Sequence, residues 1–319
     1  YDVQGVFMHN WDQQEESGVC SSAADAETAA WVCKKLGIPF IELNFVSSYW
    51  TDVFQYLVSE YSRGRTPNPD LLCNQHIKFG QLLEACQTKL GPDCKLATGH
   101  YARLLHCSGG GVRLLQAVDQ TKDQSYFLSQ VSQRALRRAI FPLGGIHKSK
   151  VREMAEAAGL TRVAGKKDST GICFIGKRNF QEFLSEYISD RPGRFLDVDT
   201  GEVVDQHRGQ HLYTVGQRCK LPAATVTAYY VAAKIAFTPD VLVCGGPHHP
   251  SLYSNTVHTE SPYWISGRPP QELVNGGAFE CEMRFRHLQP LIKCIVTEQN
   301  FAASATTGVT GNADATAGV

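Results

Sequence analysis

The sequence predicts an α/β protein in which an open parallel sheet, with helices on both faces, is followed by a helical region and a small all-β domain. Three observations carry this prediction. Strand-like and helix-like segments alternate through residues 1–100, the stretch Arg134–Arg178 is helical and basic, and short alternating strands follow a Pro/Gly-containing linker at residues 190–195. Alternating strands and helices are typical of parallel sheets, and short regularly spaced strands are typical of all-β domains.

The elements of the sheet region follow from their apolar periodicity and from residues at their ends. One helix has Ser21 or Ser22 as its N-cap and Gly37 just past its end. Large apolar side chains recur at three- and four-residue steps from Trp50 to Val58, which indicates a second helix. In chain order we expect a strand Val3–Met8, a helix Ala23–Leu36, a strand Pro39–Phe45, a helix Ser47–Ser62, a helix His76–Leu90 and a strand Lys95–Gly99.

The later elements are shorter. The glycine run at residues 109–111 has no helix after it, so we interpret it as the turn of a hairpin rather than a phosphate loop. An apolar stripe of Val151, Met154, Ala155 and Ala158 predicts a helix. We expect strands at Tyr229–Lys234, Val241–Gly245 and Cys281–Phe285. The predicted domains are a catalytic domain 1–133, a basic region 134–192, a β domain 193–301 and a disordered tail 302–319.

Composition and cysteine usage exclude several classes of protein. The chain has 43% hydrophobic residues and no apolar run of the roughly 18 to 20 residues that a membrane span needs, so we expect no membrane contact. Its eleven cysteines are scattered without a CxxC pair, which indicates a reducing compartment and argues against a zinc site. Most are expected to be packing residues: Cys33, Cys86, Cys94, Cys244, Cys281 and Cys294.

Charge is unevenly distributed although the formal net charge is zero. Between Arg134 and Arg178 there are eleven lysines or arginines against three acidic residues. A polyanion could bind there, because each phosphate contact releases condensed counterions. An ordinary solvated basic face explains the same charge count, and both interpretations stay open at this point.

Two cysteines lie in unusual settings. Cys73 follows a loop stiffened by Pro67 and Pro69, in TPNPDLLCNQHIKF, and Cys173 lies in KKDSTGICFIGKR between pairs of basic residues. Nearby cations favour the thiolate, which is the reactive form of cysteine. A buried packing role is the competing interpretation for each residue. Together the two motifs favour sulfur chemistry.

These motifs resemble those of the tRNA-specific 2-thiouridylases of bacteria and mitochondria. The segments VFMHNWD, GRTPNPDLLCNQHIKF, ATGHYAR, KDQSYFLSQV, FPLGG, KKDSTGICFIGKRNF and LYTVGQR occur in this order from Tyr1 to about Gln289. The resemblance implies a PP-loop ATP pyrophosphatase domain (adenine nucleotide alpha hydrolase-like), a central tRNA-binding region and a C-terminal β-barrel. It also implies ATP-dependent 2-thiolation of the wobble uridine of certain tRNAs.

The resemblance assigns roles to individual residues. Cys173 corresponds to the cysteine that carries the persulfide, and Cys73 corresponds to its partner, which forms a disulfide with it. Met8 and Gly99 resemble nucleotide contacts. The resemblance also implies contacts to the target base (Asn68, Pro69 and Asp70) and to the rest of the tRNA (His100, Lys122, Asp123, Gln124, Arg284, Phe285 and Arg286). His100 could instead be a strand-end packing residue, and Arg284 and Arg286 could face solvent.

The implied cofactor is ATP with Mg²⁺, and the implied partners are tRNA and a protein that donates persulfide sulfur, either a sulfur-relay protein or a cysteine desulfurase. The family's SGGVDS phosphate loop has no match in this sequence, so we expect it, one strand and any targeting peptide to precede Tyr1. The family's closing barrel strands find no match after Thr297. We expect a mitochondrial location, with the cytoplasm as the bacterial alternative. Two other functions stay open: a different PP-loop ligase, which would not need Cys173, and a noncatalytic RNA-binding protein.

Overall fold

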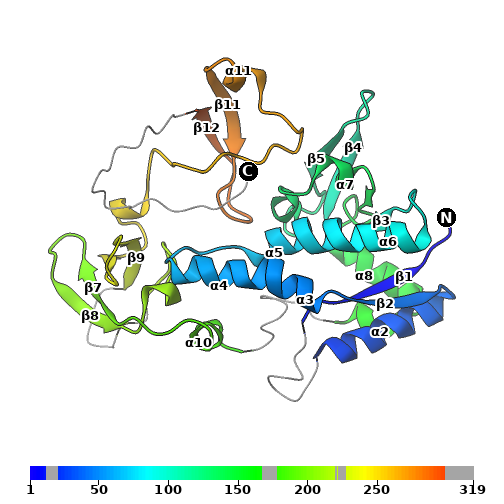
Figure 1. The fold of residues 1–319 in the computed structure, drawn as a ribbon, viewed down its shortest axis with the longest axis horizontal. Helices are drawn as coiled ribbons and strands as arrows, with labels where there is room; N and C mark the ends of the chain where they lie inside the picture. The colour runs from blue at the N-terminus through cyan, green and yellow to red at the C-terminus, as the bar shows by residue number, and fades with distance from the viewer. Residues whose placement is uncertain (12–20, 167–177, 220, 222–227, 299–319) are drawn as a thin grey trace.

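The computed structural model describes residues 1–11, 21–166, 178–219, 221 and 228–298 (Figure 1). The predicted tail at 302–319 lies outside these residues. None of the helices described there is both long and apolar enough to cross a membrane. The chain begins in a parallel α/β region and ends in a β region, in the predicted order.

The first parallel pair consists of β1 (Gly5–His9) and β2 (Phe40–Asn44), in register from Gly5↔Phe40 to His9↔Asn44. Helix α2 (Ser21–Leu36) connects the two strands and packs along them (Figure 1). A crossover that contains a helix is what two parallel strands require, and the alternating pattern predicted this strand–helix–strand unit. The observed strands differ from the expected ones by one or two residues at each end.

Two long helical runs follow β2. The first comprises α3 (Val46–Tyr49), the π-helical η1 (Trp50–Phe54) and α4 (Gln55–Ser62). The second comprises α5 (Pro69–Leu72), the π-helical η2 (Cys73–Leu82) and α6 (Leu83–Leu90). The second run begins earlier than the expected His76, because Asn68 caps it and Pro69 is accepted at the first helical position.

A second parallel pair joins β3 (Leu96–Ala97) to β6 (Ala139–Ile140). Between them lie the hairpin β4 (Ala102–His106) and β5 (Val112–Gln116), η3 (Ser125–Leu128) and α7 (Gln133–Leu136). In the described residues no ladder hydrogen bonds join this pair to β1–β2. The strands of the expected parallel sheet therefore form two parallel pairs in the described residues, and alternation had predicted their order but not which strands are neighbours.

The central region contains α8 (Lys148–Ala157), α9 (Thr161–Ala164) and α10 (Phe180–Ser185). The apolar stripe predicted for α8 is not buried: no residue of this helix is buried, and Met154 is 51% exposed. The helix that the stripe predicted is therefore present, and Val151 and Ala155 on the stripe are half-buried. In contrast, Phe183 and Leu184 of α10 are fully buried in the main core.

The β region contains a four-stranded sheet in the order β8-β7-β10-β9 and a separate hairpin. The sheet strands are β7 (Gly193–Asp197), β8 (Val203–His207), β9 (Tyr229–Lys234) and β10 (Val241–Gly245). The hairpin strands are β11 (Ala278–Met283) and β12 (Ile292–Thr297), and short helices η4 (Gln210–Leu212), η5 (Pro250–Leu252) and α11 (Gln271–Val274) lie between strands. The strand expected to reach Phe285 ends at Met283, so Arg284–Arg286 belong to the hairpin loop.

Candidate functional site

The proline-stiffened loop delivers Cys73 to the start of a π-helix. The Asn68 side chain accepts a hydrogen bond from the Asp70 backbone N–H at 3.0 Å, which caps α5. Cys73 is the first residue of η2 and is 4% exposed, within the main hydrophobic core. π-Helical turns are rare and are frequent at functional sites. The sequence-predicted cysteine thus lies at an irregular position of the fold, just beneath the loop.

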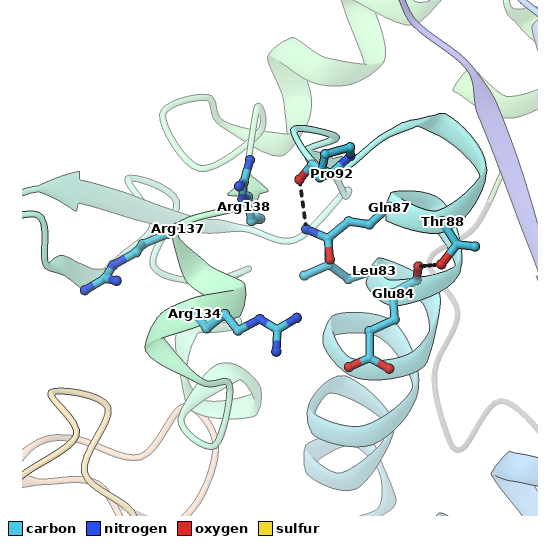
Figure 2. A pocket seen from close by; sticks show the side chains of 8 residues that line it. All are labelled: Leu83, Glu84, Gln87, Thr88, Pro92, Arg134, Arg137 and Arg138. Carbon is cyan, nitrogen blue, oxygen red and sulfur yellow. Dashed lines mark hydrogen bonds between the residues drawn. The ribbon is translucent and has the colours of Figure 1, made fainter.

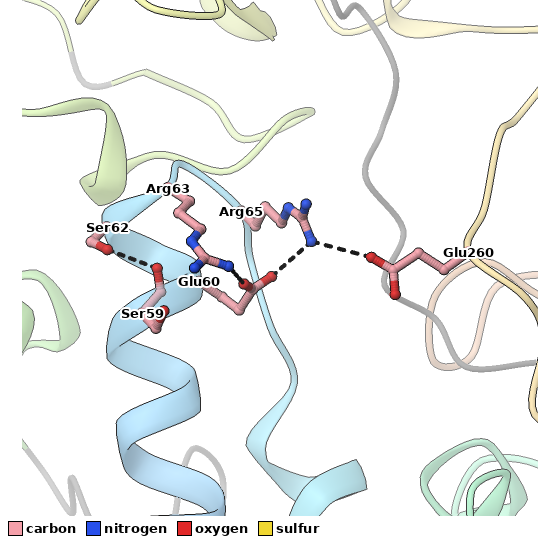
Figure 3. A network of polar contacts seen from close by, with 6 residues as sticks. All are labelled: Ser59, Glu60, Ser62, Arg63, Arg65 and Glu260. Atoms are coloured by element: carbon pink, nitrogen blue, oxygen red, sulfur yellow. Dashed lines mark hydrogen bonds and ion pairs between the residues drawn. The ribbon is translucent and has the colours of Figure 1, made fainter. Parts of the chain in front are cut away.

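A buried carboxylate anchors the start of this loop (Figure 3). Glu60, near the end of α4, is 3% exposed and forms ion pairs with Arg63 at 3.2 Å and Arg65 at 3.1 Å. Arg65 reaches a second carboxylate, Glu260, at 3.5 Å. A buried carboxylate needs such partners to remain charged. The network therefore fixes the chain between α4 and the Cys73 loop.

Two further contacts tie the same stretch to the β region. Lys234, at the end of β9, donates a hydrogen bond to the backbone carbonyl of Gly64. The hydroxyl groups of Thr66 and Thr214 lie 3.2 Å apart. The segment leading to Cys73 is therefore held from both the α/β region and the β region.

The predicted RNA contacts at 122–124 and 284–286 meet each other in space. Asp123 is fully buried, and Arg284 forms an ion pair with its carboxylate at 3.6 Å. His287 donates from Nε2 to the Asp123 backbone carbonyl at 2.8 Å, across 164 residues of sequence. The Tyr126 hydroxyl donates to the Phe285 carbonyl at 3.2 Å. We call these two segments, with Tyr126, Phe127 and His287, the junction.

The junction also contacts the Cys73 helix. The Asn74 amide donates to the Phe127 carbonyl at 2.7 Å, and the rings of Phe127 and His287 lie 4.4 Å apart. Burial raises the pKa of the Asp70 carboxyl even though part of this residue meets solvent, and the positive charges of Lys78 and His287 oppose that rise. Asp70, at the lip of the loop, therefore faces both the helix and the junction.

Three of the junction residues predicted to contact RNA form hydrogen bonds within the protein instead of facing solvent alone. The side-chain oxygen of Gln124 accepts a hydrogen bond from the Tyr101 backbone N–H at 3.0 Å. The Asp123 carboxylate accepts one from the Ala117 backbone N–H at 2.8 Å. Arg286 is exposed and donates to the Val215 carbonyl at 2.8 Å. These partners position the two loops relative to each other. Of the predicted residues in the junction, Arg286 presents the most exposed cationic side chain.

His100 is 7% exposed and packs between Phe79 and Phe141. Its Nδ1 lies 2.7 Å from the Thr98 hydroxyl. Burial, with a smaller effect from the positive charge of Lys78, lowers the pKa of His100 to about 3. The imidazole is therefore neutral at physiological pH. A neutral imidazole cannot form an ion pair with a phosphate. The predicted contact between His100 and RNA therefore stays a prediction, and it would be made by an uncharged side chain.

The predicted nucleotide contacts lie at the carboxyl ends of the parallel strands, where ligands bind in such folds. Met8 is on β1, and the exposed Gly99 follows β3. A side chain at Gly99 would meet only Leu143, at 3.8 Å, so its backbone is open to close approach by a ligand. Asn10, just past β1, has a buried side-chain oxygen without a partner in the described chain. The open backbone at Gly99 and the polar oxygen of Asn10 are suited to contact the base and ribose of a nucleotide.

Cys173 lies outside the described residues, as do Lys167 and Lys177. The residues on either side are fixed: Lys166 pairs with Asp25 at 2.6 Å, and Arg178 pairs with Glu186 at 3.6 Å. Helix α10 follows directly, and its Phe183 and Leu184 belong to the same core as Cys73. The pairing of Cys73 with Cys173 stays a prediction.

The sequence analysis assigned no role to Lys78 or His287, and it included Asn10 only as part of the segment VFMHNWD. Lys78 lies inside the quoted Cys73 motif, five residues after the cysteine, so a search for cations near the thiol could have found it. No local pattern marks His287, because its contacts arise from packing. Within the described ranges no group of three or more His, Cys, Asp or Glu side chains is arranged to hold a metal ion.

Family models and curated relatives match most of the chain. The model described as tRNA methyl transferase HUP domain matches residues 1–177, and the model described as tRNA methyl transferase PRC-barrel domain matches 181–245. Mitochondrial tRNA-specific 2-thiouridylase 1 of Homo sapiens is 44% identical over 93% of this chain and 75% of its own length. The protein of the same name from Drosophila melanogaster is 44% identical over 92% of the chain and 77% of its own. The tRNA-specific 2-thiouridylase MnmA of Alkaliphilus oremlandii is 46% identical over 91% and 78%.

The fold and these matches define a nucleotide-binding α/β domain of the HUP class followed by a PRC-type barrel, which confirms the predicted fold class. The chain belongs to the tRNA-specific 2-thiouridylase family. The barrel match ends at residue 245, so the β11–β12 hairpin that carries the junction lies beyond it.

Proposed function

We propose that this protein catalyses ATP-dependent 2-thiolation of the wobble uridine of tRNA. The identity of 44–46% to proteins named tRNA 2-thiouridylases, over more than nine-tenths of the chain, carries this proposal. The structure supports it in one respect: the two predicted RNA-contacting segments meet each other and contact the helix that begins at Cys73.

The family models are described as tRNA methyl transferases, whereas the curated relatives are named thiouridylases. Both descriptions agree on tRNA and differ in the group transferred. The names of full relatives describe the protein more specifically than a domain description does. Two long cysteine motifs agree with sulfur as the transferred group, because a thiol can carry a sulfane sulfur and exchange it.

The 2-carbonyl of uridine is a poor electrophile. When bound, ATP would supply an adenylyl group that activates the carbonyl oxygen, and pyrophosphate would be released. The terminal sulfur of the Cys173 persulfide then attacks carbon 2, and AMP leaves. The Cys73 thiolate attacks the inner sulfur of Cys173, which breaks the S–S bond to the base and leaves a Cys73–Cys173 disulfide. A reductant of the thiol class must restore both thiols before the next turnover.

The remaining residues bind and position. Asn68, Pro69 and Asp70 form the lip that receives the flipped base, and a rigid, capped turn suits that role. Met8, Asn10 and Gly99 hold the nucleoside half of ATP. No described residue is assigned to the phosphates or to Mg²⁺. Arg286 and Lys122 approach the tRNA from the junction, while Asp123 and Arg284 hold the junction together.

The partners are tRNA and a protein donor of persulfide sulfur. We propose a mitochondrial location, since two of the relatives above are named mitochondrial. A cytoplasmic location would fit the relative from Alkaliphilus oremlandii.

Cysteine substitutions in the full-length protein test the chemistry. Cys173→Ser and Cys73→Ser should each reduce 2-thiouridine formation to background while leaving tRNA affinity unchanged, because a hydroxyl cannot carry or accept sulfane sulfur. Cys86→Ser is the matched control, as a buried cysteine further along the same helical run, and it should retain activity. Normal thiolation by either of the first two variants, measured by mass spectrometry of nucleosides, would refute the mechanism.

Measurement of AMP release beside 2-thiouridine formation in the same reactions separates the two rival functions. A different PP-loop ligase would release AMP with tRNA present and leave uridine without sulfur. A noncatalytic RNA-binding protein would bind tRNA and release no AMP.

A further inference from the structure

A groove with a volume of about 610 Å³ runs between α6 and the segment from α7 to β6 (Figure 2). Arg134, Arg137 and Arg138 line one side, and Gln87 and Thr88 of α6 line the other. A second, smaller cavity shares Arg134 and Gln87 with it and continues along η2. We call the combined feature the arginine groove. None of its residues is among those assigned above to the reaction.

The charge of the arginine groove is mostly uncompensated. Glu84 is the single carboxylate among its lining residues. Arg138 pairs with Asp93 at 3.2 Å, but Asp93 is 96% exposed, so this bond contributes little. Arg134 and Arg137 are exposed and form no ion pair with any residue in the described part of the chain. Figure 2 shows Arg134 extending across the groove toward α6.

The chemistry of this lining fits a phosphate-bearing ligand. Planar guanidinium groups bind phosphate oxygens with two parallel hydrogen bonds, and several arginines are needed when the ligand carries several phosphates. The amide of Gln87 and the hydroxyl of Thr88 add neutral polar groups to the opposite wall. Leu83 and Pro92 add apolar surface beside these polar groups.

The position of the arginine groove limits the size of its occupant. Cys73 and Gln87 lie in one continuous helical run, fourteen residues apart. At about 1.5 Å per residue, the end of the groove beside Gln87 is roughly 20 Å from Cys73. A ligand that reaches both places must be long and polyanionic. An RNA helix attached to the target uridine has both properties, whereas a free nucleotide has only the charge.

We propose that the arginine groove binds the sugar-phosphate backbone of the tRNA, at a distance from the wobble base, and so contributes affinity without touching the reacting atoms. This inference rests on the proposed function, since it takes tRNA as the substrate. It goes beyond it by assigning a second contact surface to three particular arginines, at the start of the predicted basic region 134–192.

The test measures tRNA affinity against salt concentration for the full-length protein. The variant Arg134→Gln/Arg137→Gln/Arg138→Gln should bind tRNA at least about tenfold more weakly near 0.15 M salt, and its log–log salt slope should fall by about two, because each lost phosphate contact removes roughly 0.7 to 0.9. A variant with lysine at the same three positions should keep most of the slope. All three side chains are at the surface or half-buried, and unchanged melting temperatures would verify folding.

A charge-matched control removes three exposed cations elsewhere: Lys34→Gln/Lys95→Gln/Arg113→Gln. Equal slopes and affinities for the control and the groove variant would refute the proposal. So would polyglutamate binding that depends on the groove when tRNA binding does not, since that result would assign the groove to an acidic protein. Failure of the unmodified protein to form 2-thiouridine would refute the proposed function and leave this binding comparison interpretable.

Discussion

At the scale of single residues, the histidine of the ATGHYAR motif shows how burial changes chemistry. His100 lies among Phe79, Phe141 and Thr98, and its pKa is lowered to about 3, first by burial and then by Lys78. The unfolded chain, with an ordinary value of 6.5, takes up this proton first as pH falls. The stability that neutral His100 contributes is therefore fully present above pH 6.5 and is lost as pH decreases toward 3.

The direction of this pKa shift predicts how the stability of the protein depends on pH. As pH falls from 6.5 to 4.5 the free energy of unfolding should decrease through His100 alone, with a slope that approaches about 1.4 kcal/mol per pH unit below about pH 5.5. His100→Phe should remove that part of the slope in denaturant titrations, and the exposed His76→Gln should keep it. Parallel slopes for the protein and the His100 variant would show that the imidazole is solvated and not buried.

At the scale of elements, the turn after β6 depends on a close approach of two backbones. A Cβ atom built on Gly144 would lie 1.7 Å from the carbonyl oxygen of Ala102 in β4, so any side chain forces the turn and the strand apart. The Gly144 carbonyl also accepts from the Val118 N–H at 2.9 Å. The FPLGG motif therefore holds the β4–β5 hairpin against the β3–β6 pair.

The neighbouring glycine provides a matched control. Gly144→Ala should destabilise the protein by about 3 kcal/mol, because the contact is with backbone that cannot rotate away. Gly145→Ala has nothing within 4 Å of the new methyl group and should change stability little. The comparison requires only the shift in denaturation midpoint of each variant. Equal midpoints would contradict the observed approach.

At the scale of the whole molecule, the junction joins the α/β region to the hairpin loop after β11. Its contacts converge on Asp123, whose carboxylate forms an ion pair with Arg284 and whose backbone carbonyl accepts a hydrogen bond from His287. The same loop contributes the Phe285 carbonyl to Tyr126 and Arg286 to Val215. Loss of one charged contact should therefore loosen the hairpin loop while the core stays folded.

Hydrogen exchange tests this coupling. Asp123→Asn should increase exchange at residues 284–289 by about tenfold or more, because the variant removes the charge that holds Arg284. Asp119→Asn alters the same turn, but its carboxylate contacts Thr121 and Lys148 and does not reach the loop. It should leave exchange at 284–289 unchanged. Equal effects of the two variants would mean that the turn as a whole, rather than the Asp123 contact, holds the hairpin.

Much of the fold could be predicted from local sequence. The helices after β2, the β9 and β10 strands and the hairpin turn at 109–111 follow from periodicity and turn residues, which act over a few positions. The Cys73 loop could also be predicted, because each proline restricts the residue before it. Local pattern predicted the α8 helix and the order of the parallel strands, but not how little of α8 is buried or which strands are paired.

The sequence by itself determined the family, the order of the elements and which residue types carry the chemistry, because motifs and periodicities are short-range properties. Only the tertiary structure decided which distant segments meet. Asp123 and His287 are 164 residues apart, and no period or composition relates them. The same holds for the buried, neutral state of His100 and for the arginine groove, since burial and uncompensated charge depend on every element packed nearby rather than on the neighbours in sequence.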